Sequence, residues 1–174
     1  MRAEHPAAYT GRVSNPLTAD QVLRHLRRAN TIARDAISAG HHPFGALLIA
    51  PDGEGVLLEQ GNVDSVNHAE AVLAREAARL HAPTLLWQCT LVTTVEPCAM
   101  CAGTLYWANI GGLVYGISER ALRRHTGGHA ENPTLDLPCR EVFRRGQKAI
   151  DVHGPVSEVE AEIAALHRGF WKQR

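Results

Sequence analysis

The sequence predicts a single layered α/β domain, because helical and strand segments alternate after an initial hairpin. Two patterns carry this prediction: short apolar runs bounded by Gly and Pro, and amphipathic segments that open with helix-capping residues. The 174 residues are 45% hydrophobic with a formal net charge of zero, which is enough apolar material for one core. We therefore assign residues 1–16 to an N-terminal extension and residues 17–174 to one domain.

The first elements are a helix and a hairpin. Thr18 and Gln21 have the spacing of a capping box, and Gly40 is placed to end the helix that this box opens. Residues 44–50 and 56–60 are apolar runs on either side of a turn rich in Pro and Gly, so they are expected to pair as adjacent strands.

The middle of the chain alternates between the two kinds of element. Residues 69–80 are rich in helix formers and predict a second helix. Residues 90–95 predict a strand that leads into Pro97, which suits the start of a third helix ending near residue 107. Residues 113–117 predict the next strand.

The C-terminal part is predicted to contain a strand and a helix. The strand is expected over residues 149–152. The segment 157–160 has the composition of a second capping box, and an apolar stripe follows it. The stripe consists of Val159, Ile163, Leu166 and Phe170.

Three residues have the types and the spacing of a catalytic zinc site. His68, Cys98 and Cys101 supply three ligands, whereas a structural zinc is usually closed by four. Helix N-termini lower the pKa of thiols, so both cysteines are expected to bind as thiolates. Glu70 lies two residues after His68 and is expected to point past the metal toward its bound water.

Other interpretations of these residues exist. A Cys-x-x-Cys pair alone could be a redox motif or half of a four-ligand structural site. Glu70 could simply be a carboxylate that favours the start of a helix. In a noncatalytic zinc module the metal would only support folding and Glu70 would be incidental. The combination of all four residues with Pro97 favours the catalytic site.

At these residues the chain resembles the cytidine-deaminase-like superfamily, in the branch that holds guanine deaminases, fungal-type cytosine deaminases and tRNA adenosine deaminases. The resemblance runs from about residue 17 to the C-terminus and rests on 43–46, Asn62, 68–70 and 94–103. It implies a three-layer α/β/α fold with a five-stranded mixed sheet. It also implies a homodimer.

The resemblance further implies a mechanism. One Zn²⁺ per chain would bind a water or hydroxide, and this oxygen would attack an amino-bearing ring carbon. Glu70 would carry the protons, and ammonia would leave. Asn62 would hydrogen-bond the substrate ring, and we also place Phe44, Ala69 and Trp107 at the substrate.

Several of these residues have a second interpretation. Phe44 could be a core aromatic residue, and Asn62 could be a turn residue after Gly61. Trp107, like Tyr106 before it, could pack in a subunit interface. The segment 125–138 is a long loop, either a substrate-selecting lid that uses Glu131, Asn132 and Asp136 or a solvated connection.

The leading function is deamination of a small nucleobase or nucleoside, of the guanine, cytosine, isoguanine or aminotriazine class. The alternative is tRNA adenosine-to-inosine deamination, which requires a basic surface. Basic clusters include Arg27, Arg28, Arg144, Lys172 and Arg174, but the balanced net charge supplies no global attraction to RNA. We therefore expect no nucleic-acid partner.

The composition also bears on location. The sequence contains neither an apolar run of membrane length nor a signal-like start, so we expect no membrane association and a cytoplasmic enzyme. Cys89 and Cys139 do not form a spaced disulfide framework and are expected to be buried small side chains.

Overall fold

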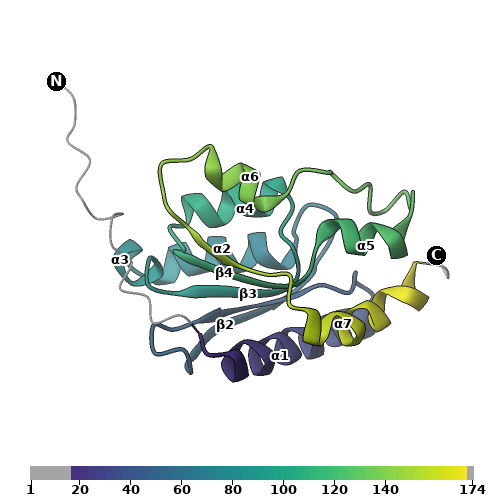
Figure 1. Ribbon diagram of the computed structural model, residues 1–174, viewed down its shortest axis with the longest axis horizontal. Helices are drawn as coiled ribbons and strands as arrows, with labels where there is room; N and C mark the ends of the chain where they lie inside the picture. The colour runs from purple at the N-terminus through teal and green to yellow at the C-terminus, as the bar shows by residue number, and fades with distance from the viewer. Residues whose placement is uncertain (1–16, 172–174) are drawn as a thin grey trace.

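A computed structural model describes residues 17–171 as a five-stranded mixed sheet with helices on both faces (Figure 1). The order across the sheet is β2-β1-β3-β4-β5. Strand β1 is antiparallel to both of its neighbours, whereas β3, β4 and β5 run parallel. The three-layer α/β/α prediction is confirmed, and the expected extension 1–16 lies outside the described residues. The strands are β1 (Gly45–Ile49), β2 (Val56–Gly61), β3 (Thr90–Val95), β4 (Gly112–Ile117) and β5 (Asp151–His153).

The helices form the two outer layers. Helices α2, α4 and α6 cover one face of the sheet, and α1 and α7 cover the other, with α5 packed against α7 (Figure 1). Within the described residues, no helix is long and apolar enough to cross a membrane. The helices are α1 (Ala19–Ser38), α2 (Ala69–Leu80), α3 (Pro83–Leu86), α4 (Ala99–Trp107), α5 (Glu119–Thr126), α6 (Cys139–Arg144) and α7 (Ser157–Phe170).

The central strands are buried on both faces. In β1, Ala46 and Leu48 belong to the apolar cluster under α2 and α4, while Leu47 and Ile49 belong to the cluster under α1 and α7. All four side chains are fully buried. Side chains alternate along a strand, so a continuous apolar run supplies both clusters at once. β3 pairs with this buried strand and lies at the centre of the sheet, and it leads through Glu96 into Pro97.

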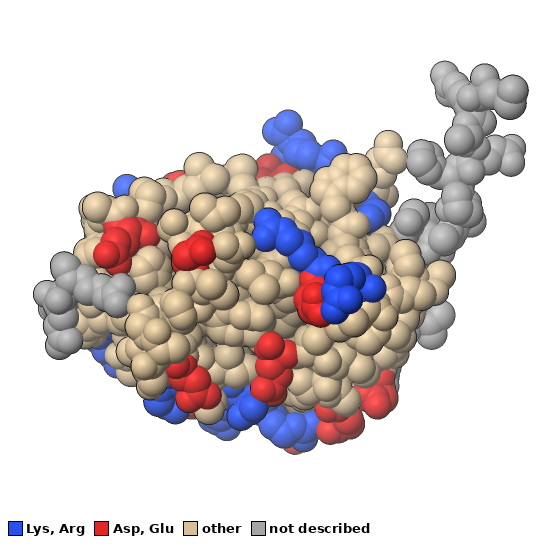
Figure 2. Space-filling view, turned by 180° about the vertical axis from the view of Figure 1, so that it is seen from behind, with Lys and Arg blue, Asp and Glu red and all other residues tan. Residues whose placement is uncertain are grey.

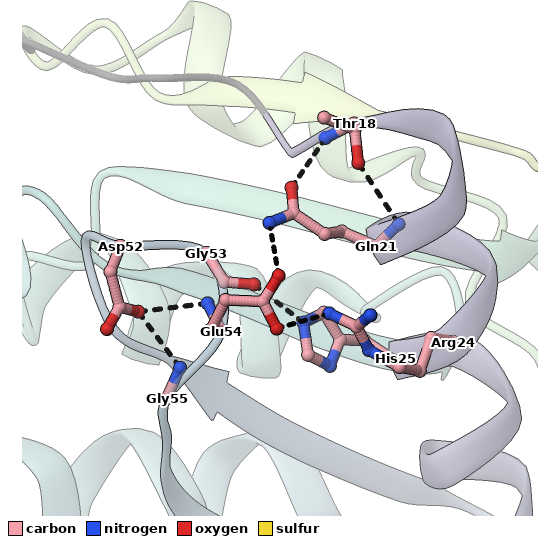
Figure 3. A network of polar contacts seen from close by, with 8 residues as sticks. All are labelled: Thr18, Gln21, Arg24, His25, Asp52, Gly53, Glu54 and Gly55. Carbon is pink, nitrogen blue, oxygen red and sulfur yellow. Dashed lines mark hydrogen bonds and ion pairs between the residues drawn. The ribbon is translucent and has the colours of Figure 1, made fainter.

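The predicted N-terminal capping box is present and is tied to the hairpin turn (Figure 3). Thr18 Oγ1 accepts from the Gln21 backbone N–H, and Gln21 Oε1 accepts from the Thr18 N–H. The Gln21 side-chain amide then donates to Glu54 in the β1–β2 turn, at 2.8 Å. Buried His25 lies 2.9 Å from the Gly53 carbonyl oxygen in the same turn. Helix α1 and the hairpin are therefore held together at both the sheet face and the turn.

The C-terminal predictions need three corrections. Val156 is the N-cap of α7 without a side-chain cap, because the Ser157 hydroxyl, already inside the helix, donates to the Glu158 carboxylate instead. The last strand is Asp151–His153, shifted from the predicted 149–152. The buried face of α7 includes His167, which is fully buried, while Leu166 and Phe170 are half-buried.

Helices α3, α5 and α6, all of which are short, were not predicted from the sequence. Helix α5 contains His125 and Thr126, so the predicted loop begins at Gly127 and not at residue 125. Ser118 caps α5 by accepting from the Ala121 backbone N–H. Cys89 and Cys139 are buried, as predicted.

Candidate metal centre and active site

Two helix N-termini bring the three predicted metal ligands together. His68 is the N-cap of α2, Cys98 is the N-cap of α4, and Cys101 lies in the first turn of α4. The C-terminal end of the central strand β3 leads into Pro97 and α4, and His68 at the start of α2 meets the two cysteines there. The ligand-capable atoms of the three residues all lie within 4.8 Å of one another.

The spacing of these atoms fits a tetrahedral ion. The two sulfurs are 3.6 Å apart, and His68 Nδ1 lies 3.7 Å from Cys98 Sγ and 3.5 Å from Cys101 Sγ. Ligands at ordinary zinc distances around a tetrahedral centre would be separated by about 3.8 Å for two sulfurs and about 3.6 Å for sulfur and nitrogen. The side chains are thus already arranged for zinc, with three ligands and one open direction.

The β2–α2 loop orients the His68 ring. The Asp64 carboxylate accepts from the backbone N–H groups of Val66 at 2.8 Å and Asn67 at 2.7 Å, which fixes the turn. The Ser65 carbonyl oxygen then lies 3.1 Å from His68 Nε2. A proton held on Nε2 by this carbonyl leaves Nδ1 free to bind a metal.

A hydrogen bond joins the Cys98 and Cys101 sulfurs, which lie 3.6 Å apart. This hydrogen bond lowers the pKa of Cys98 to about 4 against the effect of burial. The same hydrogen bond, together with burial and the nearby Glu70 charge, raises the pKa of Cys101. A cation bound by both sulfurs would displace the proton of this hydrogen bond, because metal ligands must be deprotonated.

Glu70 is buried behind the three ligands. Its side chain is 4% exposed, and burial raises the pKa of its carboxyl group. Glu70 Oε1 accepts a hydrogen bond from the Thr93 hydroxyl at 3.0 Å. Because Thr93 holds one oxygen in this way, the carboxyl group has a fixed orientation, which proton transfer requires.

A cavity of about 640 Å³ opens in front of the metal ligands. His68 and Cys98 form its floor, and Asn62 lies at its wall directly after β2. Asn62 is 3% exposed and donates to the Asp64 carbonyl at 3.1 Å, while its Oδ1 atom makes no hydrogen bond to the described part of the chain. A buried acceptor of this kind is suited to an N–H group of a bound ring.

The cavity also contains polar residues that the sequence analysis treated lightly or missed. Glu119, in the first turn of α5, lines the cavity. Burial, followed by the negative charges of Cys98, Glu70 and Glu96, raises its pKa to about 7. Glu131 of the 127–138 loop lies 3.1 Å from His42 Nε2. No sequence pattern distinguishes Glu119 from an ordinary acidic residue in the first turn of a helix.

The other predicted substrate residues lie in different places. Ala69 is fully buried between His68 and Glu70. Phe44 does not line the cavity and packs against the rings of His167, 5.4 Å away, and Trp171, 6.4 Å away.

Two further candidates lie at the surface. The Trp107 side chain is 81% exposed at the end of α4, in a surface depression between α2 and α4 rather than in the cavity. Glu131 and Asn132 of the loop line the cavity, whereas Asp136 pairs with Arg120 outside it.

The fold and this three-ligand centre define an α/β metal-binding domain. The chain matches the family model of the cytidine and deoxycytidylate deaminase zinc-binding region over residues 19–117. This is more than half of the chain, so the protein belongs to this deaminase family and carries its zinc-binding domain.

Curated relatives carry several names. The chain is 33% identical to a probable cytosine deaminase of Schizosaccharomyces pombe, covering 91% of this chain and 98% of that protein. It is 38% identical to the guanine deaminase of Bacillus subtilis, covering 52% of this chain and 60% of that protein. It is also 36% identical to a tRNA-specific adenosine deaminase of Haemophilus influenzae, covering 54% of this chain and 57% of that protein.

A solved structure shows the same fold. A guanine deaminase from Nitrosomonas europaea superimposes with a TM-score of 0.69 and 22% identity, covering 95% of this chain and 91% of the other. The resemblance that rests on residues 43–46, 68–70 and 94–103 is therefore confirmed: the family model shows the family, and the solved structure shows the fold.

Proposed function

We propose that this enzyme hydrolytically removes an amino group from a small nucleobase or nucleoside that carries no phosphate. His68, Cys98 and Cys101 hold the zinc in this proposal, and Glu70 moves the protons. The buried Glu70 carboxyl group, held by Thr93 behind a three-ligand centre, is the observation that carries it. A noncatalytic zinc module would have no use for a buried carboxyl group at this position.

Bound zinc would act as a Lewis acid and lower the pKa of water. The Glu70 carboxylate would take one proton from the attacking water and deliver it to the ring nitrogen. Glu70 would then take the second proton from the added hydroxyl and deliver it to the amino group, so that the carbon–nitrogen bond breaks, ammonia leaves and the hydroxyl oxygen becomes the ring carbonyl. Burial of Glu70 excludes competing water from this transfer.

Asn62 positions the ring. Its unsatisfied Oδ1 atom would accept from a ring N–H, and its bond to the Asp64 carbonyl holds the amide in place. The names of the relatives support cytosine and guanine as candidate rings. Isoguanine and aminotriazines remain candidates, because each has an amino-bearing carbon beside a ring nitrogen.

The charge of the cavity supports a substrate without phosphate. Asp64, Glu119 and Glu131 line the cavity, and none of its described lining residues is Lys or Arg. Hydrogen bonds from Asn67 and Val66 lower the pKa of Asp64 to about 2, so its ionised carboxylate would repel a phosphate at close range.

The Haemophilus relative supports the alternative function, which is tRNA deamination. The distribution of charged side chains on the surface gives this alternative less support. Basic and acidic side chains lie next to one another on the face in Figure 2. Arg27 pairs with Glu162 and Arg28 with Glu59, so these members of the expected basic clusters are partly neutralised. Lys172 and Arg174, also expected to contribute, lie outside the described residues.

A second copy of the chain would be the partner in a homodimer. The exposed Trp107 ring and Met100 lie over small residues of α2 and α4, such as Ala78 and Gly103. Exposed aromatic residues over small side chains are typical of interface anchors. Met100 also lines the cavity, so a partner on this face would approach the substrate entrance. A cytoplasmic location, expected from the sequence, stays a prediction.

Ammonia release tests the proposed function. Zinc-loaded protein would be assayed with guanine, cytosine, adenine, isoguanine, aminotriazines, the corresponding nucleosides and an anticodon stem-loop RNA, with Glu70→Ala as the blank. Release from a base or nucleoside supports the proposal. Release from the RNA alone would support tRNA editing instead, and release that persists in Glu70→Ala would remove Glu70 from the mechanism.

A further inference from the structure

The cavity contains a second polar group of residues that neither the metal nor Glu70 uses. Glu119 enters it from α5, and Asn132 and Thr134 enter it from the 127–138 loop. These three residues are contributed by segments that follow β4, whereas His68 and Asn62 are contributed by segments that follow β2. Polar residues therefore line the cavity on two walls, one formed by the segment after β2 and the other by the segments after β4.

One atom of this group is buried without a partner. Asn132 Nδ2 has almost no solvent contact and makes no hydrogen bond to any residue in 17–171. The Thr134 hydroxyl bonds to Glu119 and favours the ionised form of its carboxyl group. Buried polar groups are normally satisfied, so a ligand that accepts from Asn132 Nδ2 would remove an unfavourable feature of the free protein.

The hydrogen-bonding capacity of the group fits neighbouring hydroxyls. A carboxylate only accepts, an amide NH₂ only donates, and the Thr134 hydroxyl does both. A sugar diol presents two groups that each donate and accept, and an acidic side chain on a ribose hydroxyl is a known mode of recognition.

The size and the charge of the cavity point in the same direction. Pockets for drug-sized ligands measure roughly 300–1,000 Å³, and this cavity measures about 640 Å³, which leaves room beyond a single planar ring at the metal. The surplus volume is next to carboxyl groups, which disfavour a phosphate but accept hydroxyl donors.

We propose that Glu119, Asn132 and Thr134 form a ribose subsite, so that the preferred substrate is a nucleoside rather than a free base or a nucleotide. This inference rests on the proposed deaminase function. It makes Glu119 a specificity-determining residue, because its carboxylate would accept from a sugar hydroxyl that a free base lacks.

The test compares kcat/KM for guanine, cytosine and adenine with their ribonucleosides, 2′-deoxynucleosides and 5′-monophosphates. It uses the zinc-loaded wild type, Glu119→Gln and Thr134→Val. Glu158→Gln is the matched control, because Glu158 also lies in the first turn of a helix but is exposed and outside the cavity. Zinc content and melting temperature are measured for each variant.

In the wild-type enzyme, we expect kcat/KM for the ribonucleoside of the accepted base to be at least ten times the value for the free base. Glu119→Gln should lower kcat/KM for that nucleoside about 10- to 100-fold, which is the usual size of a hydrogen bond to a charged group. The value for the free base should change less than threefold, and zinc content should not change. Thr134→Val should act in the same selective way, and Glu158→Gln should behave as wild type.

Two results would overturn the subsite. One is a kcat/KM for the free base equal to that for its nucleoside, and the other is a Glu119→Gln variant whose kcat/KM falls equally for both substrates. Calorimetric binding of the same compounds to the zinc-loaded Glu70→Gln variant separates recognition from chemistry. If nucleosides bind in a way that depends on Glu119 but the wild-type enzyme releases no ammonia from them, the subsite is kept and the deaminase function is overturned. Absence of both binding and ammonia release would overturn both proposals.

Discussion

The Thr93 hydroxyl donates to Glu70 Oε1 at 3.0 Å, in a position where both side chains are buried. Thr93 lies within β3 and Glu70 in the first turn of α2, so the bond links the sheet to the helix that carries His68. Thr93 Oγ1 also lies 3.3 Å from the Gly45 carbonyl oxygen. A hydroxyl has a single proton, and the shorter distance and the charged acceptor both favour Glu70.

Thr93→Val should lower kcat about tenfold, because it removes the donor that orients Glu70 while keeping the shape of the side chain. Steady-state kinetics on the accepted substrate measure this effect. Thr93→Ser is the control, since it retains the hydroxyl and should recover most of the rate. Equal rates for the Val and Ser variants would show that this bond does not orient the carboxyl group.

Glu70→Gln should retain zinc while kcat falls by roughly 10²–10⁴-fold, the usual contribution of a positioned proton carrier. The amide has nearly the same size as the carboxyl group but cannot carry the proton. Metal analysis alongside kinetics makes the comparison. A variant that loses its zinc would point to a role in holding the metal centre instead.

Removal of zinc should abolish activity and lower the melting temperature, because an ion that binds only the folded protein stabilises it by mass action. Treatment with a strong chelator, followed by thermal unfolding and an activity assay, tests this expectation. Returning one equivalent of Zn²⁺ should restore both properties. A chelated protein with an unchanged melting temperature and full activity would contradict the assignment of the three ligands.

His167 should make the fold sensitive to acid. Burial, followed by the charge of His125, lowers its pKa to about 3, compared with an ordinary value of 6.5. The unfolded chain then binds a proton that the folded chain refuses, so stability is complete above pH 6.5 and falls as the pH decreases toward 3. The slope is about 1.4 kcal/mol per pH unit within this range.

The measurement is denaturant unfolding at pH values from 7.5 to 4, a range that covers most of this window. His167→Gln should be less stable at pH 7.5, because its ring stacks on Trp171 at 6.3 Å, but should lose less stability on acidification. A variant with the same acid dependence as wild type would show that another group is responsible.

Trp107→Glu should weaken self-association if α2 and α4 form the dimer face. A charge in place of an aromatic ring at the centre of an apolar contact is strongly unfavourable. Light scattering at several protein concentrations reports the mass of the particle. Leu135→Glu, at an exposed residue of the cavity loop, is the control for a general effect of surface charge. Equal masses for wild type and Trp107→Glu would remove this face from the assembly.

The sequence by itself determined the longer helices, the central strands and the metal ligands, but not the short helices α3, α5 and α6. The capping box at Thr18, the apolar run of β1 and the spacing of Cys98 and Cys101 are local patterns, and each has a direct physical meaning for the backbone or for a metal. His68 was predicted at the start of a helix, as were the two cysteines. The three side chains meet because both helices begin at the same end of the sheet.

The tertiary structure alone decided the surroundings of the metal centre. Glu119 is an ordinary first-turn acid in the sequence and becomes a cavity residue only because α5 follows β4 beside the metal. Thr93 differs from Thr94 only in the face of β3 from which it projects. Trp107 was expected at the substrate and lies exposed at the far end of α4. Contacts between segments distant in the chain depend on how the layers pack, and no local pattern in the sequence records that packing.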